Sequence, residues 1–126
     1  MNLKRPELFR QQCYVDGQWI IASSGKCINV TNPADGTVLG TVPSLSGPDV
    51  RQAIEAANRA LPAWRAMAAK PRAQLIRRWY ELCMAHQEDL ATLLTLEQGK
   101  PIKESRGEIA YGASFLEWFA EEAKRV

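Results

Sequence analysis

The sequence has few of the residues on which most catalytic and metal sites depend. Its 126 residues include one histidine, His86, and three cysteines, Cys13, Cys27 and Cys83. One histidine excludes a histidine pair as metal ligands, and the cysteines have neither a zinc-binding spacing nor the even number of a disulfide framework. We therefore expect His86 to be structural and the cysteines to be buried or half-buried free thiols in a reducing cytosol.

Several other patterns are missing as well. No Gly-x-Ser-x-Gly or Gly-x-Gly-x-x-Gly motif occurs, so no nucleophile elbow or dinucleotide-binding loop is expected. The net charge is +2 with both signs interspersed, which argues against a nucleic-acid partner. No stretch reaches the ~18 apolar residues of a membrane helix, and no signal peptide is recognisable at the N-terminus. We expect a cytoplasmic protein with no membrane partner.

The first third of the chain is typical of short strands, which we expect within residues 13–42. Asp16 and Gly17 lie between two β-rich arms and suit a tight hairpin turn. The turn-forming residues 32–36 separate two further strands. Two β-hairpins, or short strand pairs, are therefore predicted before the helical part.

Three helices are predicted after the strands, at about 47–61, 71–97 and 102–125. Pro62 is expected to end or kink the first helix, and Gly99 to end the second. Apolar residues recur at helical spacing in each. They are Val50, Ile54, Ala57, Leu61 and Trp64; then Leu75, Trp79, Leu82, His86, Leu90 and Leu93; then Ile109, Ala113, Leu116, Ala120 and Ala123.

Two groups of charged side chains each allow a functional and a structural interpretation. The arginines could hold an anion, and the glutamates could belong to a site. We favour a solvated surface for both. The arginines are Arg72, Arg77 and Arg78, and the glutamates are Glu104, Glu108, Glu117, Glu121 and Glu122.

The third helix is apolar over more of its circumference than the other predicted elements can cover. Its aromatic residues suit a core or an interface, or the wall of an apolar channel. They are Tyr111, Phe115, Trp118 and Phe119. The chain therefore reads as the opening of a larger protein, and spacing alone identifies no catalytic constellation.

Five motifs, in this order and at these distances, resemble the N-terminal part of the aldehyde dehydrogenase superfamily. They are YVDGQW (14–19), VTNPADG (30–36), AIEAA (53–57), LPAWR (61–65) and LEQGKP (96–101). The segments LFRQQ (8–12), GEIAY (107–111) and FLEWFAEE (115–122) look like the bacterial succinate-semialdehyde dehydrogenase branch, with glutarate-semialdehyde dehydrogenases as close relatives.

The resemblance implies an α/β parent fold and an NAD- or NADP-dependent oxidation of succinate semialdehyde to succinate by a homo-oligomer. In that family a cysteine attacks the aldehyde and hydride passes to the nicotinamide. The catalytic residues and most of the nucleotide-binding parts match no position here. We expect this chain on its own to bind no cofactor and to be inactive. The sequence does not distinguish NAD from NADP as the cofactor, or succinate semialdehyde from glutarate semialdehyde as the substrate.

Two features carry over from the family by resemblance. Some members hold a monovalent cation between a backbone carbonyl at the Val30-Thr31 step and the carboxylate of Glu97, and Tyr111 falls where the family lines its aldehyde channel. An oxygen-only shell suits a hard cation. The alternative is that Glu97 only caps or pairs at a helix end.

A second hypothesis is not enzymatic. A truncated remnant or interaction module would also explain the sequence, because an uncovered apolar helix tends to find a partner. Under this hypothesis the chain self-associates through its third helix.

Overall fold

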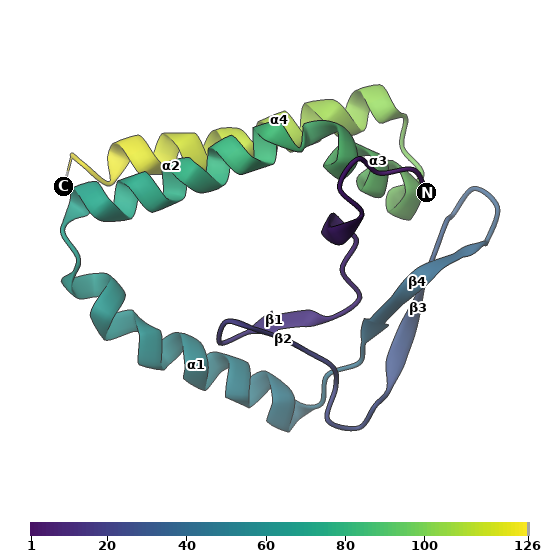
Figure 1. The fold of residues 1–126 in the computed structure, drawn as a ribbon, viewed down its shortest axis with the longest axis horizontal. Coiled ribbons are helices and arrows are strands. Elements are labelled where there is room, and N and C mark those ends of the chain that lie inside the picture. The colour runs from purple at the N-terminus through teal and green to yellow at the C-terminus, as the bar shows by residue number, and fades with distance from the viewer. Residues whose placement is uncertain (126) are drawn as a thin grey trace.

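A computed structural model describes residues 1–125, and its elements follow one another around an open frame (Figure 1). The α2 and α4 helices run side by side along one edge, α1 lies along the opposite edge beside β1 and β2, and the β3–β4 hairpin extends from one corner. The elements are η1 (Pro6–Leu8), β1 (Cys13–Val15), β2 (Gln18–Ile20), β3 (Cys27–Thr31), β4 (Val38–Pro43), α1 (Gly47–Ala66), α2 (Ala69–Ala85), α3 (Gln87–Gln98) and α4 (Ile102–Glu122).

Both predicted strand pairs are present, and each is antiparallel. Asp16 and Gly17 have φ of 51° and 77°, which is the left-handed conformation that the tight turn between β1 and β2 requires. In the β3–β4 turn, the Asn32 side chain accepts a hydrogen bond from the backbone N–H of Ala34 at 3.0 Å. The pairing of β3 with β4 is irregular between Val30 and Thr31. The turn chemistry in the sequence therefore predicted both hairpins correctly.

The first helix is longer than expected. It begins with a capping box, in which Asp49 accepts hydrogen bonds from the backbone N–H and hydroxyl of Ser46 at 2.8 and 2.7 Å. It continues through Pro62 to Ala66. The expected end at residue 61 was wrong, because a proline removes one backbone hydrogen bond of a helix without preventing the next turn from forming.

The helix expected over 71–97 is divided at His86, so four helices follow the strands instead of three. His86 has φ of −111° and ψ of 18°, outside the helical range. Its N–H still donates to Leu82 and its carbonyl still accepts from Leu90, at 3.1 and 3.0 Å. The break lets α2 and α3 reach α4 in different directions, which local periodicity does not reveal. The last helix ends at Glu122, slightly before the expected 125.

Small residues fill the interior. Within residues 1–125 every buried apolar side chain is an alanine. The predicted apolar stripes of the first two helices are mostly open to solvent, including Val50, Ile54, Leu75 and Trp79. Periodicity located these stripes, and the described chain leaves them mostly uncovered. The buried alanines are Ala22, Ala56, Ala73, Ala91, Ala113 and Ala120.

In the part of the chain that the structure describes, no helix has the length and apolar character needed to cross a membrane.

Candidate functional site

The outward side of α4 carries four aromatic residues that we call the aromatic face: Tyr111, Phe115, Trp118 and Phe119. Their spacing of four, three and one places them on one side of the helix. Tyr111 is 67% exposed and Trp118 is 63% exposed. The Tyr111 ring meets that of Phe115 nearly edge-on, with centroids 5.0 Å apart. The described part of the chain leaves this face open.

A shallow hollow of about 680 Å³ lies along the aromatic face. Its lining combines the four aromatic rings with Ser114 and three carboxylates of the same helix. Glu121 and Glu122 pair with Lys124 and Arg125 at 2.6 and 3.0 Å, so these carboxylates are partly neutralised. The arrangement suits an apolar partner or substrate wall with a polar rim.

The β3–β4 turn and the end of α3, which carry the residues predicted for a cation, come together at Pro33 and Gly99. Gly99 has φ of 80°, and a Cβ on it would lie 2.8 Å from Cγ of Pro33. Thr31 and Glu97 each lie two residues from this contact. The contact itself joins the β3–β4 turn to the α3 terminus. The backbone of α3 ends in the left-handed conformation there, as the glycine predicted.

Glu97 is exposed and makes no ion pair with any cation in residues 1–125. The pairing alternative for this carboxylate therefore has no partner in the described part of the chain. No group of three or more histidine, cysteine, aspartate or glutamate side chains within residues 1–125 could hold a metal ion. A cation at this junction would depend on backbone carbonyl oxygens together with Glu97, which is the donor chemistry of a hard monovalent ion.

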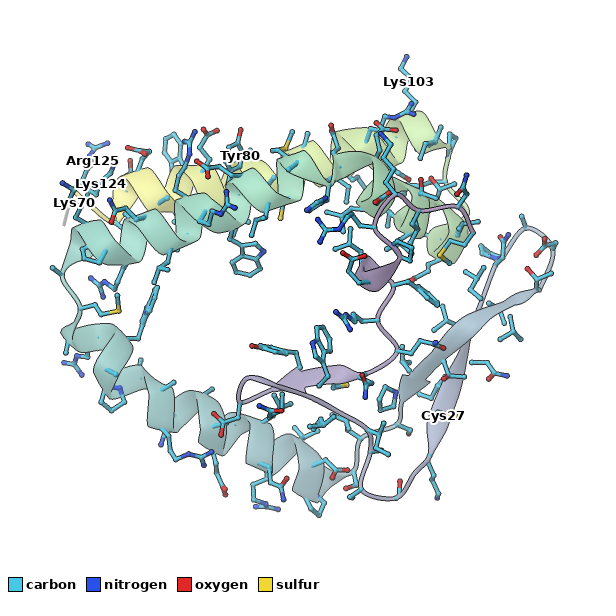
Figure 2. All side chains as sticks on the ribbon, in the orientation of Figure 1. Cys27, Lys70, Tyr80, Lys103, Lys124 and Arg125 are labelled. Atoms are coloured by element: carbon cyan, nitrogen blue, oxygen red, sulfur yellow. The ribbon has the colours of Figure 1, made fainter. Side chains whose placement is uncertain are left out.

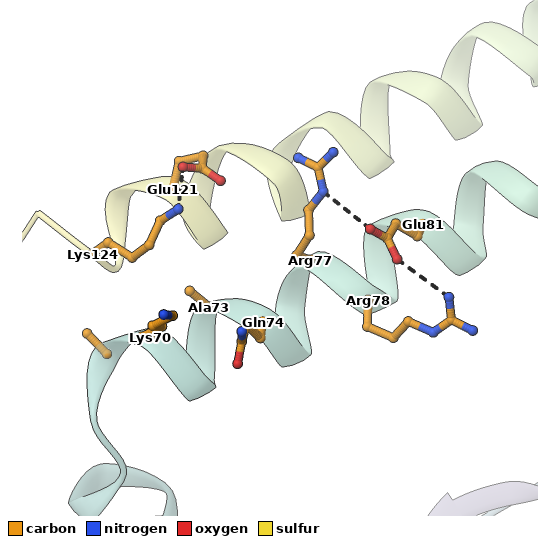
Figure 3. Close-up of a pocket in the computed structure, with 9 residues that line it drawn as sticks. Lys70, Ala73, Gln74, Arg77, Arg78, Glu81, Glu121 and Lys124 are labelled. Atoms are coloured by element: carbon orange, nitrogen blue, oxygen red, sulfur yellow. Dashed lines mark hydrogen bonds and ion pairs between the residues drawn. The ribbon is translucent and has the colours of Figure 1, made fainter.

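A second hollow, of about 720 Å³, lies between the start of α2 and the end of α4 (Figure 3). Arg77 donates to Glu117 of α4 at 2.7 Å, and its Nε lies 3.7 Å from Glu81. Arg78 reaches the same Glu81 at 3.5 Å. These ion pairs support the interpretation of Arg77 and Arg78 as solvated surface residues. Arg77 ties α2 to α4, whereas Arg78 pairs within α2. They do not form an open anion site.

The single histidine and the thiols have no shared site. His86 is half-buried at the α2–α3 junction. Cys13 and Cys83 are half-buried, and burial raises the pKa of the Cys83 thiol. Cys27 is exposed on β3, away from the α2–α4 pair (Figure 2), so the expectation that all three are at least half-buried was wrong for this residue. Figure 2 also shows Lys70, Lys124 and Arg125 gathered at the far end of that pair.

Sequence reasoning missed one buried carboxylate, Asp89. It lies in the first turn of α3, 5% exposed, and accepts backbone hydrogen bonds from Lys4 and Arg5. Its partners are more than eighty positions away in the sequence. The one sequence signal for this role is an acidic residue near a helix N-terminus. That signal was missed because a single unbroken helix was expected over this region.

Comparison with known proteins gives a consistent result over the whole chain. The model of the aldehyde dehydrogenase family matches residues 19–126. A glutarate-semialdehyde dehydrogenase of Pseudomonas putida is 60% identical over all 126 residues, and an NADP(+) succinate-semialdehyde dehydrogenase of Escherichia coli is 58% identical. The chain covers 26% of the length of each.

Solved structures of this family match the fold over the same part of their length. A crystal structure of an aldehyde dehydrogenase from Brucella melitensis biovar abortus superposes with a TM-score of 0.99 at 55% identity. That match covers 100% of this chain and 26% of the other. The chain thus spans about a quarter of the length of the relatives that it matches.

Proposed function

Because this chain belongs to the aldehyde dehydrogenase family, we propose that it serves as the N-terminal segment of an enzyme that oxidises a short semialdehyde to its acid. Members of this family bind NAD(P), which accepts hydride from the substrate. The substrate is a semialdehyde of the succinate or glutarate type, in a cytoplasmic homo-oligomer. The proposal assigns no catalytic residue to residues 1–126, so the chain alone turns over no aldehyde.

The open aromatic face is the observation that carries this proposal. Burying apolar surface contributes roughly 25 cal/mol per Å² to stability, so a helix with four open aromatic rings is far more stable once covered. The exposed apolar stripes of α1 and α2 would be stabilised by burial in the same way. The role of this segment is therefore to present a wall of apolar side chains against which the remainder of the enzyme folds.

A chimera tests the proposal directly. Residues 1–126 replace the matching segment of the Pseudomonas putida glutarate-semialdehyde dehydrogenase, and aldehyde-dependent formation of reduced nicotinamide is followed with succinate and glutarate semialdehydes. We expect activity within about tenfold of the parent, because the two segments are 60% identical. The parent without its segment and the isolated chain are both expected to be inactive. A folded but inactive chimera, or turnover by the isolated chain, would refute the proposal.

We further propose that Tyr111 lines the aldehyde channel of the complete enzyme. Tyr111 is 67% exposed and borders the hollow on α4, where a small aldehyde could pass. In the chimera, Tyr111→Ala should raise KM for the semialdehyde severalfold more than Lys103→Ala, a control that points away from the molecule at the start of the same helix (Figure 2). Equal KM values for both variants would exclude Tyr111 from the channel.

We also propose a monovalent cation at the junction of Val30, Thr31 and Glu97. The approach of Pro33 to Gly99 supports it, because this contact brings the strand end and the helix end together. The chimera should melt at a higher temperature in sodium or potassium chloride than in choline chloride at equal ionic strength. Glu97→Gln should abolish that difference, whereas Glu104→Gln, in the first turn of α4, should preserve it. A salt response that Glu97→Gln leaves unchanged would contradict the site.

The interaction-module hypothesis draws on the same aromatic face. If the isolated chain associates with itself while the chimera is folded but inactive, this second function replaces the first. An active chimera built from a chain that is monomeric on its own would remove its support.

A further inference from the structure

The residues before β1 connect two parts of the frame that are distant in sequence. From their place beside α3 they run past η1 to the strands (Figure 1). At one end, the backbone N–H groups of Lys4 and Arg5 donate to the two carboxylate oxygens of Asp89 at 2.9 and 2.8 Å. Asp89 is buried, so this two-pronged, charge-assisted contact is shielded from water.

The other end of the same segment is attached to β4. The side-chain carbonyl of Gln11 accepts a hydrogen bond from the backbone N–H of Thr41 at 2.8 Å. The ring of Phe9 lies over Gly40 so closely that a Cβ there would be 2.6 Å from a ring atom. Phe9 thus occupies the space that any larger residue at position 40 would need.

Together, these contacts hold the β3–β4 hairpin against α3 at two places. The β3–β4 hairpin touches the end of α3 through Pro33 and Gly99, while residues 4–11 join β4 to the start of α3. The hairpin is therefore attached to both ends of one helix, and each attachment restricts the other. Loss of either leaves the hairpin held at one end.

We propose that residues 4–11 are a strap that fixes the β3–β4 hairpin on α3, with Asp89 as its latch. The strap determines how firmly the turn carrying Pro33 is pressed against Gly99, the junction where the strand end meets the helix end. This inference concerns the chain's own conformation and does not rest on the proposed enzymatic function.

Hydrogen exchange of the full 126-residue chain, read at single amides by NMR, tests the strap. In Asp89→Asn, the amides of Lys4 and Arg5 should exchange about tenfold faster, because a hydrogen bond to a charged acceptor is lost. The amide of Thr41 should accelerate with them, although it lies on β4 and does not touch Asp89. Glu104→Gln is the matched acid-to-amide control and should leave all three amides unchanged.

Gly40→Val attacks the strap from the opposite end, because its side chain would displace Phe9. It should accelerate exchange at Lys4 and Arg5, far from the substitution. Should Asp89→Asn fail to fold, Gly40→Val and the milder Gln11→Ala decide the question through these same two amides. The proposal is overturned if a substitution accelerates exchange at one end of the strap and leaves the other end unchanged. It is also overturned if the amides of Lys4 and Arg5 in the unaltered chain exchange as fast as those of a free peptide.

Discussion

The α4 helix has one side of small buried residues and one side of large exposed residues. Ser105, Ala113 and Ala120, which we call the small-residue face, are at most 3% exposed. On the aromatic face, Tyr111 and Trp118 have more than half of their surface in solvent. A helix in a self-contained small domain normally buries its large apolar side chains and exposes its small or polar ones.

The difference shows which contacts hold the described chain together. Small side chains let α2, α3 and α4 approach one another closely, and polar contacts such as Thr95 Oγ1 to Ser105 Oγ at 2.8 Å connect them. The aromatic rings contribute little to this packing. The described chain leaves them exposed, and it spans 26% of the length of the relatives that it matches.

Overpacking the small-residue face should give the largest effect. Ala120→Leu adds side-chain atoms at a position with no exposed surface and should lower the free energy of unfolding by about 1–3 kcal/mol. The neighbouring Phe119→Leu, on the aromatic face, should change it by less than about 0.5 kcal/mol. Urea denaturation followed by circular dichroism measures both. Similar losses at the two positions would mean that the two faces do not differ energetically.

Removing the buried hydroxyl of the small-residue face should have a smaller effect. Ser105→Ala leaves the Thr95 hydroxyl without its partner and should destabilise the chain by about 1 kcal/mol. The double variant with Thr95→Val removes both partners and should recover most of that loss. The same denaturation experiment tests this cycle. Strictly additive losses would show that the two hydroxyls are not coupled.

The N-terminal cap of α1 contains a buried carboxylate, Asp49, whose contribution to stability depends on pH. The hydroxyl of Ser46, followed by its backbone N–H, lowers the pKa of Asp49 from 3.8 to about 2. A carboxyl with a lowered folded-state pKa stabilises the fold fully above its unfolded pKa, and this contribution disappears as the pH falls from about 4 to about 2.

Asp49→Asn should therefore lower the melting temperature at about pH 6 by more than at about pH 2, since the unaltered chain loses the charge by itself in acid. Glu55→Gln, at an exposed acid of the same helix, is the control for acid-to-amide change. Thermal melts over this pH range measure the difference. A gap between Asp49→Asn and the unaltered chain that stays constant across the range would contradict the assigned pKa.

Reducing the aromatic face should have the smallest effect on stability. Trp118→Ser with Phe119→Ser removes two open rings and should change the free energy of unfolding of the isolated chain by less than about 1 kcal/mol. Self-association measured by sedimentation velocity should nevertheless weaken at least severalfold, because an exposed apolar patch drives it. Lys103→Ser is the control and should leave self-association unchanged. If the double variant also associates as strongly as the unaltered chain, the self-association surface lies elsewhere.

The parts predicted correctly depend on local chemistry. The Asp16-Gly17 turn and the Gly99 helix end follow from backbone conformations that few residues adopt. The position of Tyr111 on an apolar side of α4 follows from helical periodicity. The candidate channel and cation residues came from the family resemblance and stay predictions. The fold adds the contact of Pro33 with Gly99, which lie two positions from Thr31 and Glu97.

Local chemistry along the chain was enough to set the strand pairs, the approximate helices and the aromatic face, because turns and amphipathic periods arise between near neighbours. Contacts between distant residues determined the rest. The division at His86, the Asp89 latch and the burial of alanines in place of aromatic rings all depend on which helices meet and which residues reach them. A sequence pattern shows that a helix has an apolar side, but only its packed neighbours determine whether that side is covered.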